Sequence, residues 1–250
     1  MASRPAAGGG MWVEVGPDRF ARWCDGFAQR HDGLAHEPSL VTDEASGGGE
    51  AVELAAADGS TATCHVPFPP LSPAPRLDFD PATDTATGTG TGPDAGPDAS
   101  LIDRLVAHAL ADRTVGVLLV RRGGFAVGIF EGTRLAESKI GARHVQGRTK
   151  AGGWSQQRFA RRREGQAREA YAAAADTAAR LLLPRAADLD ALVVGGDAGA
   201  ISALRTDVRL KPLWPKETTS FVNVGDPKAA DLLKAREGFR AVRIRLVEQS

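Results

Sequence analysis

The chain has 250 residues, 42% hydrophobic and 25% charged, a balance typical of a globular protein with one large domain or one domain with appendages. Its 31 basic and 31 acidic side chains cancel, which excludes a uniformly basic or acidic protein, and no apolar run approaches the roughly 20 residues of a membrane span. Cys24 and Cys64 are the only cysteines. They argue against a structural zinc and favour buried free thiols in a reducing cytoplasm, with a single disulfide as the alternative.

The N-terminal part of the chain predicts one helix and three strands. Residues 1–10 are rich in Gly and Ala, lack the apolar core of a secretory signal, and are expected to be disordered. Trp12 to Phe27 predicts a strand followed by an amphipathic helix. Gly49 to Phe68 predicts a β-hairpin, because alternating apolar residues flank the turn signal Asp58-Gly59.

A composition shift separates this part from the rest. From about 69 to 100 the chain is dominated by Pro, Gly, Ala, Thr and Asp, which bury too little apolar surface to offset the entropy of ordering. We expect a flexible insertion within a single domain that runs from 11 to 250. Leu101 to Arg113 predicts an amphipathic helix, in which His108 is expected to be structural or exposed and not catalytic.

The middle of the chain predicts an antiparallel meander and then a long helix. Three strands are expected at Thr114–Arg122, Gly124–Gly132 and Thr133–Gly141, joined by turns short enough for hairpins, with a short extended piece, ARHVQG, after them. A helix begins near Ser155, extends about 40 Å, and ends at Pro184.

The last third predicts alternating strands and helices. A buried strand at Leu189–Asp197 leads into a short helix, a further strand and helix follow, and Phe239–Gln249 closes the chain as an alternating strand. We interpret GGDAG, which begins at Gly195, as a tight strand-to-helix turn, because it lacks the full dinucleotide-binding pattern. The whole predicts an α/β fold with a mixed sheet and flanking helices.

Positive charge is concentrated in one stretch, Lys139 to Arg168. It holds nine Lys or Arg and one acid, Glu164, so its formal charge is 9 − 1 = +8 in a chain that is neutral as a whole. Such a segment is typical of a surface that contacts a polyanion, and we expect that polyanion to be RNA.

The centre of this stretch reads KAGGWSQQRFARRR. It resembles the GGQ loop of archaeal and eukaryotic translation termination release factors, and the resemblance extends over roughly Thr114 to Val247. The positions that match in register are Gly152, Gly153, Ser155, Arg158, Phe159, Ala160, Arg161 and Arg163. The resemblance implies a ribonuclease H-like central release-factor domain with a long helix after the glutamine loop, and no separate stop-codon-reading domain.

One departure from the family pattern indicates a particular branch of the family. Trp154 stands where the family's catalytic glutamine stands, and Gln156 and Gln157 follow it. This shift is similar to the Vms-type ribosome quality control branch, its actinobacterial members in particular. The resemblance implies a cytoplasmic, monomeric hydrolase without cofactor or metal. Its partners would be the large ribosomal subunit, ribosomal RNA and peptidyl-tRNA, with no membrane.

The residue types suit this chemistry. A glutamine amide cannot act as a base near neutral pH, but it can orient a water molecule toward an ester, and we favour Gln156 over Gln157 for this role. Gly152 and Gly153 allow close approach of the backbone to the CCA end of tRNA. The expected RNA contacts are Arg148, Lys150, Trp154, Arg158, Arg161, Arg162 and Arg163.

Two other functions fit the same stretch. A tRNA endonuclease that cuts near the CCA end would need a group to activate a ribose hydroxyl, and His144 is the nearby candidate. A non-catalytic ribosome-binding module would follow if Trp154 had ended catalysis. The recruiting partners and any methylation of a glutamine stay open.

Overall fold

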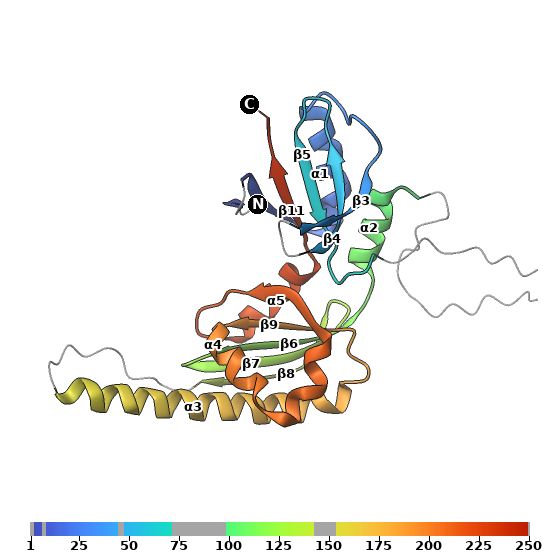
Figure 1. The fold of residues 1–250 in the computed structure, drawn as a ribbon. Helices are drawn as coiled ribbons and strands as arrows, with labels where there is room; N and C mark the ends of the chain where they lie inside the picture. Colours follow the sequence, from blue (N-terminus) through green and yellow to red (C-terminus); the bar gives the residue numbers. More distant parts are fainter. Residues whose placement is uncertain (1–2, 7–8, 45–47, 72–98, 143–153, 250) are drawn as a thin grey trace, which may run out of the picture. The chain divides into compact units, whose positions relative to one another are not determined.

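The structure is a computed structural model that describes residues 3–6, 9–44, 48–71, 99–142 and 154–249. For Ser3, 154–164 and 219–220 it describes the backbone alone. Its contacts divide the chain into two compact units (Figure 1). Unit 1 is Met1–Asp112 with Arg240–Ser250, and unit 2 is Arg113–Phe239. The sequence pattern predicts one domain from 11 to 250, whereas each unit has a sheet and an apolar core of its own.

Unit 2 is built on a five-stranded mixed sheet in the order β10-β9-β6-β7-β8. Its strands are β6 (Thr114–Arg121), β7 (Gly124–Glu131), β8 (Arg134–Ala142), β9 (Ala191–Gly196) and β10 (Glu217–Val222). β6, β7 and β8 form an antiparallel meander, while β9 runs parallel to both β6 and β10.

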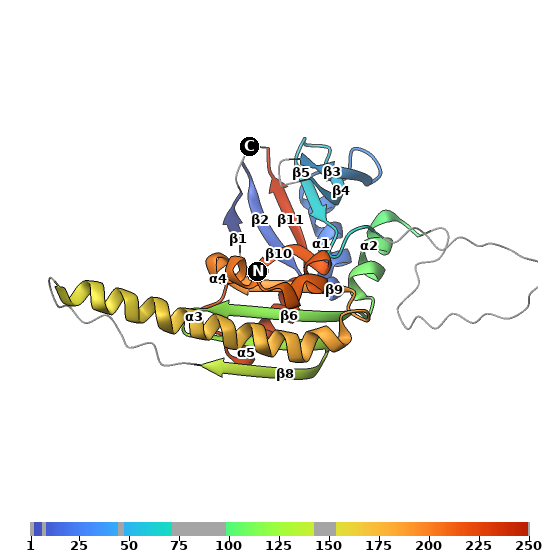
Figure 2. The same ribbon diagram turned by 60° about the horizontal axis from the view of Figure 1, so that its bottom comes forward.

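Helices cover both faces of this sheet. The elements after β8 are α3 (Trp154–Leu182), η2 (Leu183–Arg185), α4 (Ala198–Arg205), η3 (Val208–Lys216) and α5 (Ala229–Arg240). α3, α4 and η3 share one core with the sheet, and α3 lies along β6 to β8 (Figure 2). α5 packs on the opposite face, since a Cβ added at Gly128 would lie 3.3 Å from Leu232 of α5.

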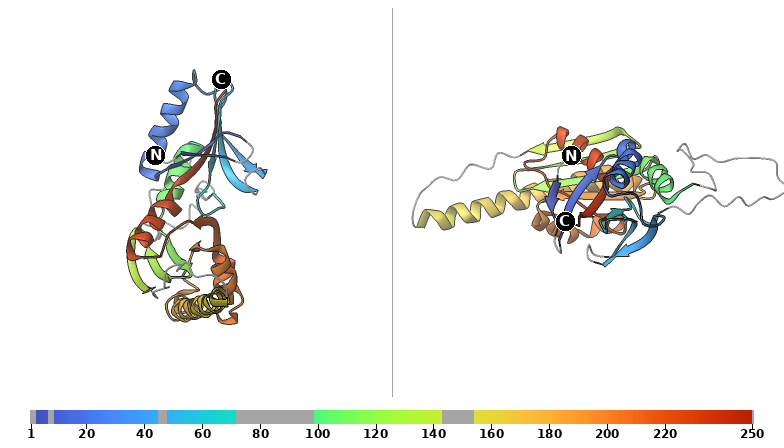
Figure 3. Two further views of the ribbon diagram at one scale, coloured as in Figure 1. Left: turned by 90° about the vertical axis from the view of Figure 1, so that its left-hand side faces the viewer. Right: turned by 90° about the horizontal axis from the view of Figure 1, so that it is seen from above.

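Unit 1 is a six-stranded antiparallel sheet in the order β1-β2-β11-β5-β4-β3. Its strands are β1 (Ser3–Pro5), β2 (Met11–Val15), β3 (Ser39–Asp43), β4 (Gly49–Ala55), β5 (Thr61–His65) and β11 (Val242–Val247). Its two helices, α1 (Pro17–Arg30) and α2 (Leu101–Leu110), lie on the same side of the sheet (Figure 3, left). Ser100 and Asp103 form a capping box at the start of α2.

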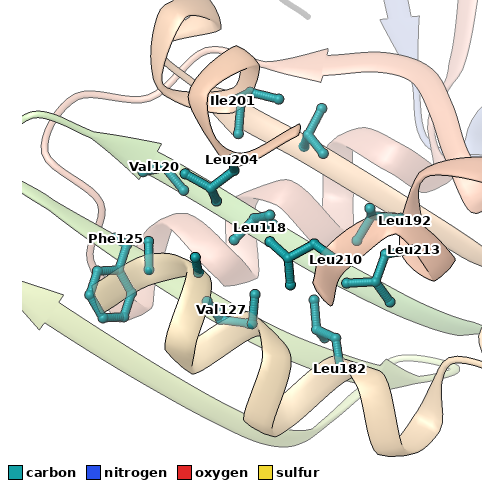
Figure 4. Packing of buried hydrophobic residues seen from close by; sticks show 14 of the residues in the cluster. Leu118, Val120, Phe125, Val127, Leu182, Leu192, Ile201, Leu204, Leu210 and Leu213 are labelled. Carbon is teal, nitrogen blue, oxygen red and sulfur yellow. The ribbon is translucent and has the colours of Figure 1, made fainter. Parts of the chain in front are cut away.

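Each unit buries its own apolar cluster. In unit 2, Leu118 and Val127 of the sheet face Leu182 of α3 and Leu210 of η3 (Figure 4). In unit 1, the inward residues of β2, β4, β5 and β11 meet Phe20 and Phe27 of α1. Branched aliphatic and aromatic side chains supply the apolar area that stabilises each unit.

The expected α/β fold with a mixed sheet, flanking helices and a long helix is confirmed. The long helix begins at Trp154, so Gln156 and Gln157 belong to its first turn and not to a loop before it. The predicted hairpin at Gly49–Phe68, the meander and the helix that ends at Pro184 are all present. The ARHVQG piece lies almost wholly outside the described residues, as do residues 72–98 of the expected insertion.

Four features differ from the sequence analysis. β1 lies in the segment expected to be disordered, and β3 and η3 were not expected. The closing strand β11 joins the sheet of unit 1, between β2 and β5, because its alternating residues match the apolar face of those strands.

None of the helices in the described ranges combines the length and apolarity needed to span a bilayer.

Candidate functional site

The N-terminal part of α3 carries most of the predicted site. The helix begins at Trp154, so the backbone of Gln156 and of Gln157 lies in its first turn. The next turns carry four arginines: Arg158, Arg161, Arg162 and Arg163. The side chains of these residues, and the whole of Arg148, Lys150, Gly152 and Gly153, lie outside the described parts of the structure.

The other half of α3 is anchored on the sheet. Ala170, Ala174 and Ala178 recur every four residues and are buried, followed by Leu181 and Leu182. Small side chains at this spacing let the helix axis approach the strands closely. Along the part of α3 whose side chains are described, burial begins at Ala170.

This anchoring leaves the glutamines remote from the packed body. Gln156 precedes Ala170 by 14 positions on one continuous helix, which corresponds to about 21 Å at 1.5 Å per residue. Figures 1 and 2 show the N-terminal part of α3, drawn in yellow, continuing past the ends of the strands of unit 2. The helix therefore forms an arm that carries its first turn away from the sheet.

Cations also stand at the base of this arm. Lys139 on β8 and Arg168 on α3 are exposed, and within the described residues no ion pair joins either one to a carboxylate. Both belong to the +8 stretch of the sequence. Charges that are not neutralised by their own protein are available to phosphate groups.

His108 is structural, as expected. Its side chain is buried, and its Nε2 lies 2.8 Å from the carbonyl oxygen of Pro67 and 3.2 Å from that of Phe68. A carbonyl oxygen only accepts, so Nε2 carries the proton and donates it. His144, the candidate for an endonuclease, lies outside the described residues.

The GGDAG segment is a strand-to-helix turn, which confirms the interpretation from sequence. Gly196 adopts a positive φ of 101°, which favours glycine. Asp197 then caps α4, and its side chain accepts a hydrogen bond from the backbone N–H of Gly199 at 2.9 Å. A carboxylate at this helix start disfavours the binding of phosphate there.

Neither cysteine suits nucleophilic chemistry. Cys24 and Cys64 are both free and buried, as expected. Burial, with the negative charge of Asp25, raises the pKa of Cys24 to about 12, and burial raises the pKa of Cys64 well above its ordinary value. Among the described residues, no cluster of His, Cys, Asp and Glu could hold a metal ion.

Comparison with known proteins gives a family for this arrangement. Residues 113–245 match the model of a family described as "Actinobacteria/chloroflexi VLRF1 release factor". This range is more than half of the 250 residues, and it includes the whole of unit 2 and most of β11. No curated protein matches the chain.

Two archaeal structures are similar to part of the chain. One is a crystal structure of the archaeal translation termination factor aRF1, with a TM-score of 0.37 and 21% identity over 50% of this chain. The other is described only as an archaeal protein, with a TM-score of 0.37 and 20% identity over 54% of this chain. The match spans about a third of each of those chains, 32% and 35%.

Proposed function

This chain belongs to the Actinobacteria/chloroflexi VLRF1 release factor family, and we propose that it is a peptidyl-tRNA hydrolase that frees nascent chains from stalled large ribosomal subunits. Membership of a release factor family supports a role in translation, with the ribosome as the expected partner. The proposal adds the substrate, the reaction and a cytoplasmic place of action.

One observation carries the proposal. The two glutamines lie in the first turn of a 29-residue helix, and along the part whose side chains are described, burial begins at Ala170. A site for peptidyl-tRNA on a large subunit is enclosed by RNA, so a catalytic group must be carried to it on a narrow extension. An arm about 21 Å long, rich in arginine and one helix wide, suits this task.

The chemistry proposed for the arm is water positioning. The carbonyl oxygen of a glutamine accepts a hydrogen bond from the attacking water and aims it at the ester carbonyl. The first backbone N–H groups of a helix have no partner within it, so the start of α3 supplies donors for the oxyanion that develops. Gly152 and Gly153 precede these donors and would admit the tRNA end to close range.

The arginines serve binding rather than chemistry in this proposal. Arg158 and Arg161 to Arg163 occupy four of six successive helical positions, and at 3.6 residues per turn these positions are distributed around the helix axis. Arginine pairs with phosphate through two parallel hydrogen bonds and keeps its charge at all physiological pH values. Together with Arg148 and Lys150, and with Trp154 stacking on a base, they would hold the arm in its RNA surroundings.

The direct test is a release assay. Purified large subunits that carry peptidyl-tRNA are incubated with the wild type and with Gln156→Ala, Gln157→Ala and the double variant. We expect the double variant to lose at least a hundredfold in the rate of peptide release, and Gln156→Ala to lose more than Gln157→Ala. Gln166→Ala, on the same helix, is the matched control and should release peptide at the wild-type rate.

Two outcomes would replace the proposal. If the double variant releases peptide as fast as the wild type, the glutamines do not position water. If the wild type releases no peptide but binds the subunits tightly, the protein is a non-catalytic ribosome-binding module.

A further inference from the structure

One face of the unit 1 sheet is free of its helices. The apolar residues of β2, β5 and β11 share one buried cluster with residues of α1 and α2, so by strand alternation the residues between them point to the other side of the sheet. The strand register places Arg245 beside Trp12, and Trp12 beside Arg4. Arg243 stands between His65 of β5 and the exposed Glu14 of β2. We call this side of the sheet the open face of unit 1.

Aromatic and cationic groups are in contact on the open face. The Arg243 guanidinium lies over the Trp12 indole, with its Cζ 4.2 Å from the ring centroid. The His65 imidazole meets the same indole at a centroid distance of 5.2 Å. All three side chains are partly buried, and the Nε of Arg243 is buried without a hydrogen-bond partner in the described part of the structure.

Arg243 has an acidic neighbour in Glu14 but no ion pair with it among the described residues. Burial lowers the pKa of its guanidinium, and the nearby charge of Arg4 lowers it further, while Glu14 acts in the opposite sense. Within the described residues, neither Arg4 nor Arg243 forms an ion pair with Glu14 or any other carboxylate. A partly desolvated cation of this kind is stabilised when an external anion pairs with it.

Elsewhere on the open face, the basic side chains have a buried carboxylate beside them. Asp43 is buried, and its carboxylate lies 3.1 Å from His65 and 3.9 Å from Arg245. Burial nevertheless lowers the pKa of His65, with Arg243 and Arg245 adding to the effect against the attraction of Asp43. At neutral pH His65 is therefore an uncharged ring, which leaves the unpaired charge at Arg4 and Arg243.

We propose that the open face of unit 1 binds a segment of single-stranded RNA. Arg243 and Arg4 would pair with its phosphate groups, while the planes of Trp12, Arg243 and His65 would stack with an unpaired base. An acidic peptide would match the charge but offers no flat rings to stack. This site is separate from the α3 arm in sequence, and it depends on the proposed function only for the presence of RNA.

Photo-crosslinking of the full-length protein tests this site. A 12-nucleotide RNA that contains 4-thiouridine is irradiated with the protein, and crosslinked peptides are mapped by mass spectrometry. We expect two groups of crosslinks, one in the arm and one in β2 or β5 at Trp12 or His65. Arg243→Gln should lower the second group at least fivefold and leave the first unchanged.

Two variants serve as controls. Arg22→Gln removes an equal charge from the exposed side of α1 and should leave both groups of crosslinks unchanged. Arg243→Lys keeps the charge but not the flat contact with Trp12, so it should give an intermediate loss. Melting temperatures within about 2 °C of the wild type show that the variants are folded.

The proposal is overturned if crosslinks map only to the arm, or if Arg243→Gln and Arg22→Gln behave alike. It is also overturned if a polyglutamate peptide blocks the β2 and β5 crosslinks as well as unlabelled RNA does, since the face would then select acidic peptides. The release assay with glutamine variants is independent of all these results, so failure of one proposal is distinguishable from failure of the other.

Discussion

The two halves of α3 have opposite compositions, although they form one helix. From Ala170 to Leu182 the buried positions are alanine, threonine and leucine, and they recur at the spacing that faces the sheet. Upstream, four arginines fall within the six positions from Arg158 to Arg163. The packed half supplies the helical nucleus, and arginine, glutamine and alanine are good helix formers, so local propensity favours continuation of the helix into the arm.

This contrast shows how an extension can be built from one helix. Packing stabilises one half against a sheet, and continuity of hydrogen bonding carries that order into the other half. The packed half should therefore respond to changes in volume and burial, and the arm to changes in charge. The predictions below test this separation, starting with the largest effect.

The largest contrast is expected in thiol reactivity. With a pKa of about 12, the Cys24 thiol is ionised in only about one molecule in ten thousand at pH 8, and Cys64 is buried as well. A Ser155→Cys variant, made with Cys24→Ala and Cys64→Ala, should react with iodoacetamide at least a thousandfold faster than the native thiols. Equal rates, measured by mass spectrometry, would show that the arm is not exposed.

The second largest effect is expected when a charge is introduced at a buried position in the packed half of α3. Ala174 is fully buried against the sheet, so Ala174→Asp should lower the free energy of unfolding by roughly 3 kcal/mol or more. Ala172→Asp, at an exposed position of the same helix, is the control for helix propensity. Urea unfolding followed by circular dichroism measures both, and equal losses would contradict the packing described for α3.

Charge removal in the arm should weaken RNA binding without affecting stability. Replacing Arg161, Arg162 and Arg163 by Gln should weaken binding to large subunits by about tenfold to a hundredfold and reduce its salt dependence. A triple Gln variant at Arg19, Arg22 and Arg180, all exposed elsewhere, carries the same change in charge. Sedimentation at several salt concentrations measures the affinity of each triple variant for large subunits. Indistinguishable affinities would show that the arm is not part of the binding surface.

The smallest effect concerns pH. Because the folded state lowers the pKa of His65, the unfolded chain binds a proton more readily as the pH falls below about 6.5. The free energy of unfolding should therefore decrease from pH 7 to pH 5, and His65→Gln should make this decrease smaller. His36→Gln, at an exposed position, should leave the pH profile unchanged.

Hydrophobic periodicity and turn residues predicted most helices and strands. They did not predict which strands pair when those strands lie far apart in the sequence. The hairpin, the meander and the long helix follow from periodicity and turn residues over short stretches. β11 pairs with β2 and β5, which lie far away in sequence, and no local signal specifies such partners. β3 is short and mostly polar, and η3 contains Pro212 and Pro215, so neither shows a clear period.

The candidate site was only partly predictable for a related reason. The glycines, glutamines and arginines of the loop and arm are adjacent in sequence, so one motif reveals them together. The open face of unit 1 joins Trp12 and His65 to Arg243 near the other end of the chain. The alternation of Arg243 and Arg245 with Val242 and Ile244 was a visible signal of a two-sided strand, but it did not reveal which rings lie beside the arginines.

The central claim, that α3 directs a water molecule to the peptidyl-tRNA ester, is tested most directly by isotope transfer. Stalled large subunits are incubated with the wild-type protein in water enriched in oxygen-18, and both products are analysed by mass spectrometry. The account predicts one oxygen-18 atom in the carboxylate of the released peptide and a tRNA with an intact CCA end. A peptide that still carries a nucleotide, or a shortened tRNA, would contradict it and indicate RNA cleavage instead.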